Sequence, residues 1–303
     1  MKVIISGADG FVGRHLTERL LMLGHEVVAI SRNTSRYRQD KTPSVMVIGW
    51  DSQQIREEIR DAGAVVNLAG ESIFGRRWTR SKKARILNSR LIAGQKLRDA
   101  LVHQQHKDMV YIQASAIGFY GNAGEKICSE LSDQGKGFLA RVCGKWESYV
   151  PDIERDGVRT LILRIGVVLG EGGGFLHEMS RQSRHHLAGK LGNGRQWLSW
   201  IHMHDLVEAI IFLINSANAS GTLNLVAPKP VRQKIFLRAL SKHNGRNLQL
   251  FAPAWAIKLL LGSMGKELIL WGQNVSSKKI ALMGFRFRFG EIDAALEDLL
   301  SPE

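Results

Sequence analysis

The sequence predicts an α/β protein, in which a Rossmann-like, doubly wound parallel sheet carries a smaller, mostly helical lobe on its substrate side. Strand-like apolar runs alternate with helix-like segments through the first 165 residues, a pattern typical of parallel sheets that are covered by helices. The first run leads into a glycine-rich turn and then into a helix-like segment, which is the context of a dinucleotide-binding turn. From residue 170 onward, glycine-rich loops and then helices replace this alternation and predict the second lobe.

Composition restricts the class of protein. The chain has 303 residues, of which 44% are apolar and 23% charged, as in ordinary globular proteins. No apolar run approaches the ~18 residues of a membrane span, and the N-terminus lacks the layout of a signal peptide. Two cysteines, Cys128 and Cys143, are too few for a disulfide framework. We therefore expect a cytoplasmic protein without a membrane partner.

The net charge of +14 favours anionic ligands. Its densest basic segments, residues 32–38 and 76–90, are short, and the other basic residues are dispersed. We therefore expect a basic surface with a phosphate-rich small ligand, and we place nucleic-acid binding well behind it.

The glycine-rich turn, residues 6–13, follows the strand-like run 3–5 and opens a helix expected from Phe11 to Leu23. Its G-x-x-G-x-x-G spacing puts Gly7 at the tight turn, Gly10 where backbone approaches a pyrophosphate, and Gly13 where the helix packs on the sheet. The free N–H groups of that helix favour phosphate. We expect cofactor contacts from Gly7, Asp9, Gly10, Phe11, Val12 and Gly13.

The end of the second strand selects the cofactor. Gly24 is expected to end the first helix, and residues 25–30 form the strand. Ser31 and Arg32 follow where an NAD-binding protein would carry a carboxylate for the ribose 2′-hydroxyl. A guanidinium suits a 2′-phosphate, so we predict NADP(H), with Arg36 and Arg38 close by. The alternative is that these arginines are ordinary loop residues.

The remaining elements complete the two regions. Strands are expected at 44–48, at 64–70 (where the strand runs into a glycine turn), and at 109–115, 159–165, 198–202 and 222–226. Helices are expected at 53–62, within 78–102, at 138–149 and at 206–214. The NADP(H)-binding core would take residues 1–165 and 201–226. The substrate-side lobe would take residues 166–200 and 227–303.

Several of these motifs together resemble a known family. Residues 6–13, 67–70, 114–121 and 200–205 resemble the turn, the fourth-strand motif, the fifth-strand end and the late loop of extended short-chain dehydrogenases/reductases. Residues 67–71, 88–90, 137–140, 146–147, 191–194 and 199–202 are similar to the atypical, YfcH-like branch of the NAD-dependent epimerase/dehydratase type. The segment 254–300 resembles its C-terminal module. The likeness covers essentially the whole chain.

This resemblance implies further cofactor contacts. It implies NADP(H) and places Leu68, Ala69 and Gly70 of the fourth-strand motif beside it, with Ser115 and Arg164 further along the same edge. Arg90 occupies the position of a cofactor-adjacent asparagine in ordinary members, although it also fits a surface arginine of a basic helix.

Ordinary members of the superfamily use a Ser/Thr, Tyr, Lys triad, in which the lysine lowers the tyrosine pKa from ~10. No such pair lies in the expected helix: alignment on Glu147 puts Leu139 at the tyrosine position and Cys143 at the lysine position. The strand before it has Ala116 at the hydroxyl position. Tyr37 has a lysine four residues on, in a loop after the second strand, and we take this match as chance.

Other residues are candidates to replace the triad. Tyr120 is a candidate proton donor, and Ser115 is a candidate to orient a substrate oxygen; Cys143 and Lys145 are further candidates near the nicotinamide. We expect Asp205 to be a helix N-cap rather than a metal ligand, and no metal site. Trp197 and Trp200 fit the core better than a substrate pocket.

Two functions remain open. One is an NADP(H)-dependent oxidoreductase or epimerase with a rearranged proton-transfer group, acting on a sugar-like or carbonyl small molecule. The other is a non-catalytic NADP(H)-binding sensor or partner protein. The sequence leaves the oligomeric state open.

Overall fold

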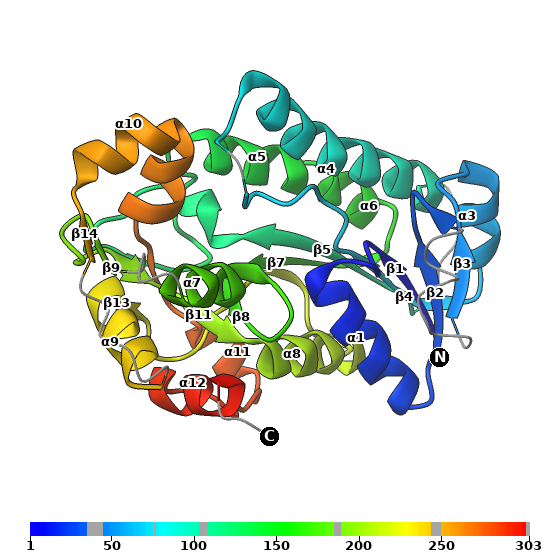
Figure 1. Ribbon diagram of the computed structural model, residues 1–303. Helices are drawn as coiled ribbons and strands as arrows, with labels where there is room; N and C mark the ends of the chain where they lie inside the picture. Colours follow the sequence, from blue (N-terminus) through cyan, green and yellow to red (C-terminus); the bar gives the residue numbers. More distant parts are fainter. Residues whose placement is uncertain (35–44, 76, 103–107, 185–188, 244–249, 301–303) are drawn as a thin grey trace.

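A computed structural model describes residues 1–34, 45–75, 77–102, 108–184, 189–243 and 250–300. Its centre is a sheet of seven parallel strands between two layers of helices (Figure 1). The strands lie in the order β12-β7-β5-β4-β1-β2-β3. Their bounds are β1 Lys2–Ser6, β2 Glu26–Ile30, β3 Val45–Ile48, β4 Ala62–Asn67, β5 Val110–Ala116, β7 Arg159–Ile165 and β12 Gly221–Leu225.

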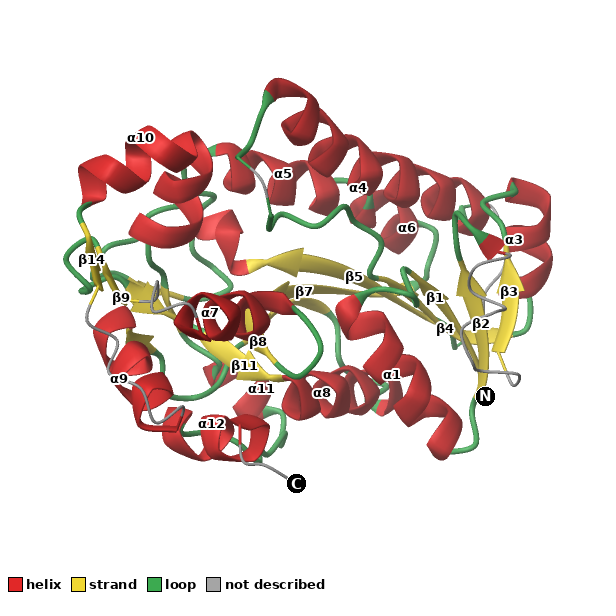
Figure 2. Cartoon of the chain, viewed as in Figure 1, coloured by secondary structure: helices red, strands yellow, loops and turns green. Residues whose placement is uncertain are grey.

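Alternation along the strands explains the two layers. In β1, Val3 and Ile5 face one core and Ile4 the other, because successive side chains of a strand point to opposite faces. The first core is covered by α1 (Phe11–Met22) and α8 (Met203–Asn215), and the second by α3 (Ser52–Ile59), α4 (Arg80–Leu101) and α6 (Val150–Arg155). Figure 2 shows these helices on opposite sides of the sheet. Strands buried on both faces read as continuous apolar runs, which is why they were predictable.

The strand order reverses beside β1. From β1 the chain proceeds to β2 and β3 on one side, then returns to place β4 and β5 on the other. The loops that follow β1 and β4 therefore leave the sheet in opposite directions and border a crevice at its carboxyl edge. In open α/β sheets this is where ligands bind.

A second region is built from short strand pairs and helices. The pairs are β6 (Ile127–Cys128) with β15 (Asn274–Val275), β8 (Val167–Leu169) with β11 (Trp200–His202), β9 (Gly189–Leu191) with β14 (Leu250–Ala252), and β10 (Trp197–Leu198) with β13 (Val231–Arg232). Its helices are α7 Gly174–Arg184, α9 Gln233–His243, α10 Ala254–Gly265, η2 Lys266–Leu270, α11 Lys278–Leu282 and α12 Ile292–Leu300. Trp200 is fully buried in the core of this region, as expected. The helical turn η1 (Ile117–Tyr120) directly follows β5, and α5 (Phe138–Glu147) lies beside α4 on the central sheet (Figure 1).

The predicted fold class is confirmed, with one local correction. Asp205 does not cap α8: the cap is His202, whose Nδ1 accepts the His204 N–H at 3.2 Å. The Asp205 carboxylate instead accepts the backbone N–H groups of Arg288 and Phe289, each at 2.9 Å.

The division into core and lobe stays a prediction, and the predictions for Arg36, Tyr37 and Arg38 fall outside the described residues. None of the described helices combines the length and apolar character needed to cross a membrane.

Candidate functional site

The glycine turn after β1 is closed too tightly for side chains. Gly7 has φ +76°, a conformation that L side chains rarely adopt, and its carbonyl accepts the Gly10 N–H at 3.0 Å. A Cβ at Gly13 would lie 2.1 Å from the Gly7 carbonyl oxygen, so α1 packs directly on the turn. A Cβ at Gly7 would lie 3.0 Å from backbone atoms of Ala69, in the loop after β4. The two loops of the crevice therefore touch through glycine.

The start of α1 presents unsatisfied backbone donors. Its N-cap is Gly10, which has no side chain to cap the helix. Within the described residues, the N–H groups of Phe11, Val12 and Gly13 have no hydrogen-bond acceptor. Asp9 and Gly10 are exposed, and Phe11 and Val12 are half-buried. A close-packed turn with open N–H groups and a positive helix dipole fits the pyrophosphate of a dinucleotide.

A buried amide network ties the ends of the central strands together. Asn67, at the end of β4, accepts the Ser6 hydroxyl at 2.7 Å and the Ala69 N–H at 3.3 Å through Oδ1. Its Nδ2 donates to Gln113 Oε1 at 3.0 Å and to the Tyr111 hydroxyl at 3.3 Å. Buried polar groups fully paired in this way fix one arrangement, here that of Leu68 and Ala69, which are half-buried beside the glycine turn.

Two residues of α4 hold the next part of this loop. Ser89 Oγ accepts the Glu71 N–H at 2.9 Å, and Arg90 Nη1 donates to the Glu71 carbonyl at 3.1 Å. A Cβ at Gly70 would lie 2.8 Å from Cζ of Arg90, so glycine leaves the room that the guanidinium occupies. The resemblance singled out residues 67–71 and 88–90 separately, and the structure brings them into contact.

The end of β2 lies beside the same turn. The Gly7 N–H donates to the Ile30 carbonyl at 3.4 Å. Ser31 is buried and its Oγ accepts the Asn33 N–H at 3.2 Å, which fixes the bend after the strand. Arg32 is exposed at this bend. The structure therefore brings Ser31 and Arg32 next to the glycine turn.

The ends of β5, β7 and β12 share a buried polar network. Arg164 donates to both carboxylate oxygens of Glu147, at 3.1 Å and 2.9 Å, and to the Tyr120 hydroxyl at 3.2 Å. Ser115 donates to Glu147 Oε1 at 2.5 Å, and Tyr120 donates to Asn224 Oδ1 at 2.6 Å. Ser115, Tyr120 and Arg164 are thus brought together, but their polar atoms already have partners inside the protein, chiefly Glu147 and Asn224.

Burial and hydrogen bonding act against each other on the pKa values of this network. Burial raises the pKa of the Tyr120 hydroxyl, and the nearby Arg164 only partly offsets that rise. It also acts to lower the pKa of Arg164, but hydrogen bonds to Glu147 and Tyr120 outweigh burial and raise it. Arg164 therefore stays a cation paired with the Glu147 carboxylate, and Tyr120 stays a neutral phenol at neutral pH.

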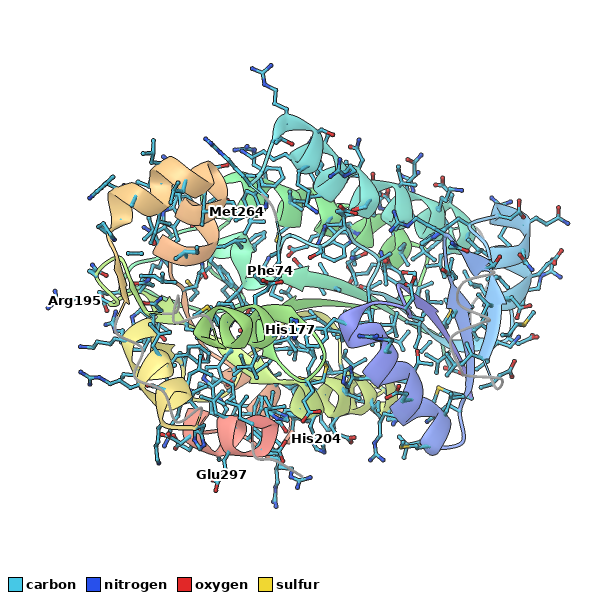
Figure 3. All side chains as sticks on the ribbon, viewed as in Figure 1. Phe74, His177, Arg195, His204, Met264 and Glu297 are labelled. Carbon is cyan, nitrogen blue, oxygen red and sulfur yellow. The ribbon has the colours of Figure 1, made fainter. Side chains whose placement is uncertain are left out.

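Helix α5 carries an apolar surface toward the site. Gly118 in η1 packs against this helix so closely that a Cβ at Gly118 would lie 3.2 Å from the Leu139 Cβ and 4.0 Å from the Cys143 sulfur. Burial and the Glu147 carboxylate raise the pKa of the Cys143 thiol to about 11, so it is protonated at neutral pH. Lys145 is exposed on the outer side of the helix. In Figure 3, Phe74, Met264 and His177 lie around the carboxyl end of β5 in that view.

The C-terminal region caps α5. Glu267 in η2 accepts the Phe138 N–H through Oε1 and the Leu139 N–H through Oε2, each at 2.9 Å. The N-cap residue, Gly137, supplies no side-chain acceptor. Sequence reasoning missed Glu267, because no local signal marks a cap that lies 129 residues further along the chain. Sequence reasoning also used Glu147 only to align the helix. An acidic residue on an apolar helix face could have indicated a buried cationic partner, which the structure shows to be Arg164.

Comparisons with known proteins agree with this architecture. The model of the NAD dependent epimerase/dehydratase family matches residues 3–225, and that of a domain of unknown function, DUF1731, matches residues 252–299. Epimerase family protein YfhF of Bacillus subtilis is 36% identical over 99% of this chain and 98% of its own. Epimerase family protein SERP0438 of Staphylococcus epidermidis is 33% identical over 99% of both chains.

Solved structures give the same result. The human epimerase family protein SDR39U1, crystallised with NADPH, superposes with a TM-score of 0.88 at 29% identity and covers 99% of both chains. The UDP-glucuronic acid 4-epimerase of Bacillus cereus has a TM-score of 0.79 at 17% identity over 99% of this chain and 98% of its own, a likeness of fold. The family resemblance inferred from the motifs is confirmed: the chain belongs to the NAD dependent epimerase/dehydratase family and carries a DUF1731 domain in its C-terminal region.

Proposed function

We propose that the protein binds NADP(H) and is an atypical short-chain dehydrogenase/reductase, an oxidoreductase or nucleotide-sugar-epimerase-like enzyme without the usual Ser-Tyr-Lys triad. The choice of NADP(H) over NAD(H) rests on the residues at the end of β2. There an exposed Arg32 stands beside the glycine turn, and Ser31 in place of a carboxylate precedes it. An arginine binds a 2′-phosphate as a charge-assisted fork, whereas a carboxylate would repel it.

The residues of the crevice support binding of the whole dinucleotide. The N–H groups at the start of α1 would hold the pyrophosphate, and the loop from Leu68 to Gly70 would border the nicotinamide half. A bound nicotinamide would supply hydride transfer. The chain's own part is to orient it and to move a proton, for which Ser115 and Tyr120 are the proposed groups. Both hydroxyls are buried and bonded within the protein, so either would have to exchange a partner to reach a substrate.

Cofactor choice is tested by titration. We expect NADPH to bind more tightly than NADH, and Arg32→Asp to weaken NADPH by roughly 10- to 100-fold with little change for NADH. Arg60→Asp makes the same charge change at the end of α3, before β4 and so at the opposite edge of the sheet, and should change neither affinity. Equal affinity of the wild-type protein for both cofactors would refute the proposed preference.

Activity is tested with the cofactor that binds. Oxidation of NADPH would be followed against a panel of carbonyl compounds, and sugar interconversion against a panel of nucleotide sugars, because the family name points to such substrates. Turnover that Ser115→Ala or Tyr120→Phe removes without loss of NADPH affinity would identify the proton-transfer group. Tight NADPH binding without turnover on either panel would instead favour a sensor or partner protein. A cytoplasmic location and a small-molecule substrate are part of this proposal.

A further inference from the structure

Helix α10 is apolar on two opposite sides. Its inner side packs into the protein: Ile257 and Met264 are buried, and Met264 belongs to the apolar cluster that joins α10 to the first parts of α4 and α5. Its outer face carries Trp255, Leu259 and Leu260, which are 69%, 68% and 69% exposed. Trp255 and Leu259 are one helical turn apart, so they share the centre of this face. A helix that is apolar all round is normally covered on every side, and a contiguous exposed apolar face marks an interaction site.

Cations surround the outer face of α10. Lys258 is exposed on the same side of the helix, and Lys266 is exposed directly after its end. The Arg77 guanidinium lies against the kink of α10, because a Cβ at Gly262 would lie 3.2 Å from its Nε. Arg80 is exposed at the start of α4, which lies with α10 along the upper side of the molecule in Figure 1. Within the part of the chain that the structure describes, none of these four cations forms an ion pair with a carboxylate.

The charge of this surface restricts what can cover it. The two segments that form it, residues 72–87 and 253–266, contain no aspartate or glutamate. The carboxylates that flank them are engaged elsewhere, Glu71 with Lys82 and Glu267 with the start of α5. If the outer faces of two copies of the chain met, their cations would repel each other. An anionic lipid surface instead offers an apolar layer to leucine, an interface that suits tryptophan, and negative headgroups to the cations.

We propose that the outer face of α10, with Arg77 and Arg80 beside it, binds an anionic membrane surface. In this arrangement α10 lies in the plane of the membrane, with Trp255 and Leu259 at the boundary between headgroups and acyl chains and the cations on lipid phosphates. The expectation of no membrane partner rested on the lack of a spanning run, and a helix that lies on a membrane needs none. The proposal is independent of the proposed NADP(H) function.

Flotation of the purified full-length chain with lipid vesicles tests this proposal. Vesicles of phosphatidylglycerol and phosphatidylcholine in equal parts are compared with vesicles of phosphatidylcholine alone. We expect the chain to float with the mixed vesicles and not with the neutral ones. Binding should weaken as the salt concentration rises from about 0.1 M to about 1 M, because the screening length then falls from ~10 Å to ~3 Å.

Variants assign the binding to the outer face. Trp255→Ser/Leu259→Ser removes its centre and should weaken binding to the mixed vesicles by roughly 100-fold, and Lys258→Glu should weaken it by roughly tenfold. One matched control is Leu282→Ser, which removes a leucine of α11 that is 77% exposed. The other is Arg60→Glu, which reverses a charge at the end of α3, on the opposite side of the molecule in Figure 1. Both controls should bind as the wild type does.

Each other outcome overturns the proposal. If the wild-type chain does not float with the mixed vesicles at low salt, the outer face has another occupant, such as an acidic protein. Equal binding to neutral vesicles, or equal loss of binding in the controls, means that the apolar face and its cations do not determine it. Self-association in sedimentation velocity that Trp255→Ser/Leu259→Ser abolishes means that a second copy covers the face. If this double variant does not fold, Lys258→Glu is compared with Arg60→Glu, and equal vesicle binding of the two refutes the proposal.

Discussion

Glu267 joins the C-terminal domain to the helix that borders the candidate site, and its removal has a calculable cost. Its carboxylate accepts two backbone N–H groups at the start of α5, both at 2.9 Å. Loss of a helix N-cap costs about 1 kcal/mol, within a range of roughly 0.5–2. Loss of a negative charge at a helix N-terminus costs about 0.3–1 kcal/mol more. We therefore expect Glu267→Ala, which removes both acceptors, to lower the free energy of unfolding by about 1–3 kcal/mol.

Glu267→Gln refines this expectation. The amide keeps one acceptor oxygen and loses the charge, so its cost should be about 1 kcal/mol. A side chain at the N-cap position itself cannot replace Glu267, because Gly137 has φ +126° and a Cβ there would lie 2.7 Å from Trp271. Gly137→Asp, which would improve most helix starts, should therefore destabilise this one.

Urea unfolding followed by circular dichroism measures these costs. The control is Glu291→Gln, which removes an exposed ion pair with Lys229 and should change the free energy of unfolding by less than about 1 kcal/mol. If Glu267→Ala is no more destabilising than this control, water satisfies the start of α5 and the C-terminal domain does not support it. NADPH affinity measured on the same variants would show whether α5 must be capped for cofactor binding.

Three further outcomes follow from single residues. Gly13→Ala should weaken NADPH binding at least tenfold and lower the free energy of unfolding by about 1–3 kcal/mol, because the new Cβ would lie 2.1 Å from the Gly7 carbonyl oxygen. Gly49→Ala is the control in both measurements, because the space around Gly49 is open. Glu147→Gln leaves Arg164 buried without a counter-charge and should cost about 3 kcal/mol in urea unfolding; a cost below about 1 kcal/mol would contradict the role of the pair. Burial lowers the pKa of His202 from 6.5 to about 4, so its unfolded form binds a proton that the folded form does not, and stability should fall by about 3 kcal/mol as the pH drops from 6.5 to 4. His202→Asn should flatten that part of the pH profile, and an unchanged slope would assign it to other groups.

Much of the fold can be predicted because its signals are local. The glycine turn, the apolar strands and the bend at Ser31 and Arg32 each depend on residues within one strand, turn or helix. Their conformations follow from backbone sterics and from the two-residue and 3.6-residue periods of strands and helices. The parallel sheet then follows from the alternation of the elements, and the crevice follows from the sheet.

Long-range partners could not be predicted in the same way. Asp205 is of a residue type that often caps helices, and it lies near the start of a helix. Its carboxylate nevertheless accepts backbone N–H groups 83 and 84 residues further along the chain. The local pattern is compatible with either use, and only the packing of the C-terminal segment against α8 decides between them. The helix begins at Met203, so His202 and not Asp205 occupies the N-cap position.

The same distinction holds at the candidate site. The order of the amino acids alone predicts a dinucleotide-binding turn and a strand end suited to NADP(H). It also places leucine and cysteine in α5 where a tyrosine and a lysine were sought. Tertiary packing decides that Ser115 and Arg164 bond to Glu147, that Glu267 caps α5, and that the Arg90 guanidinium packs beside Gly70. A side chain's rotamer and partner are set by the surfaces that surround it, and those surfaces come from segments far apart in the chain.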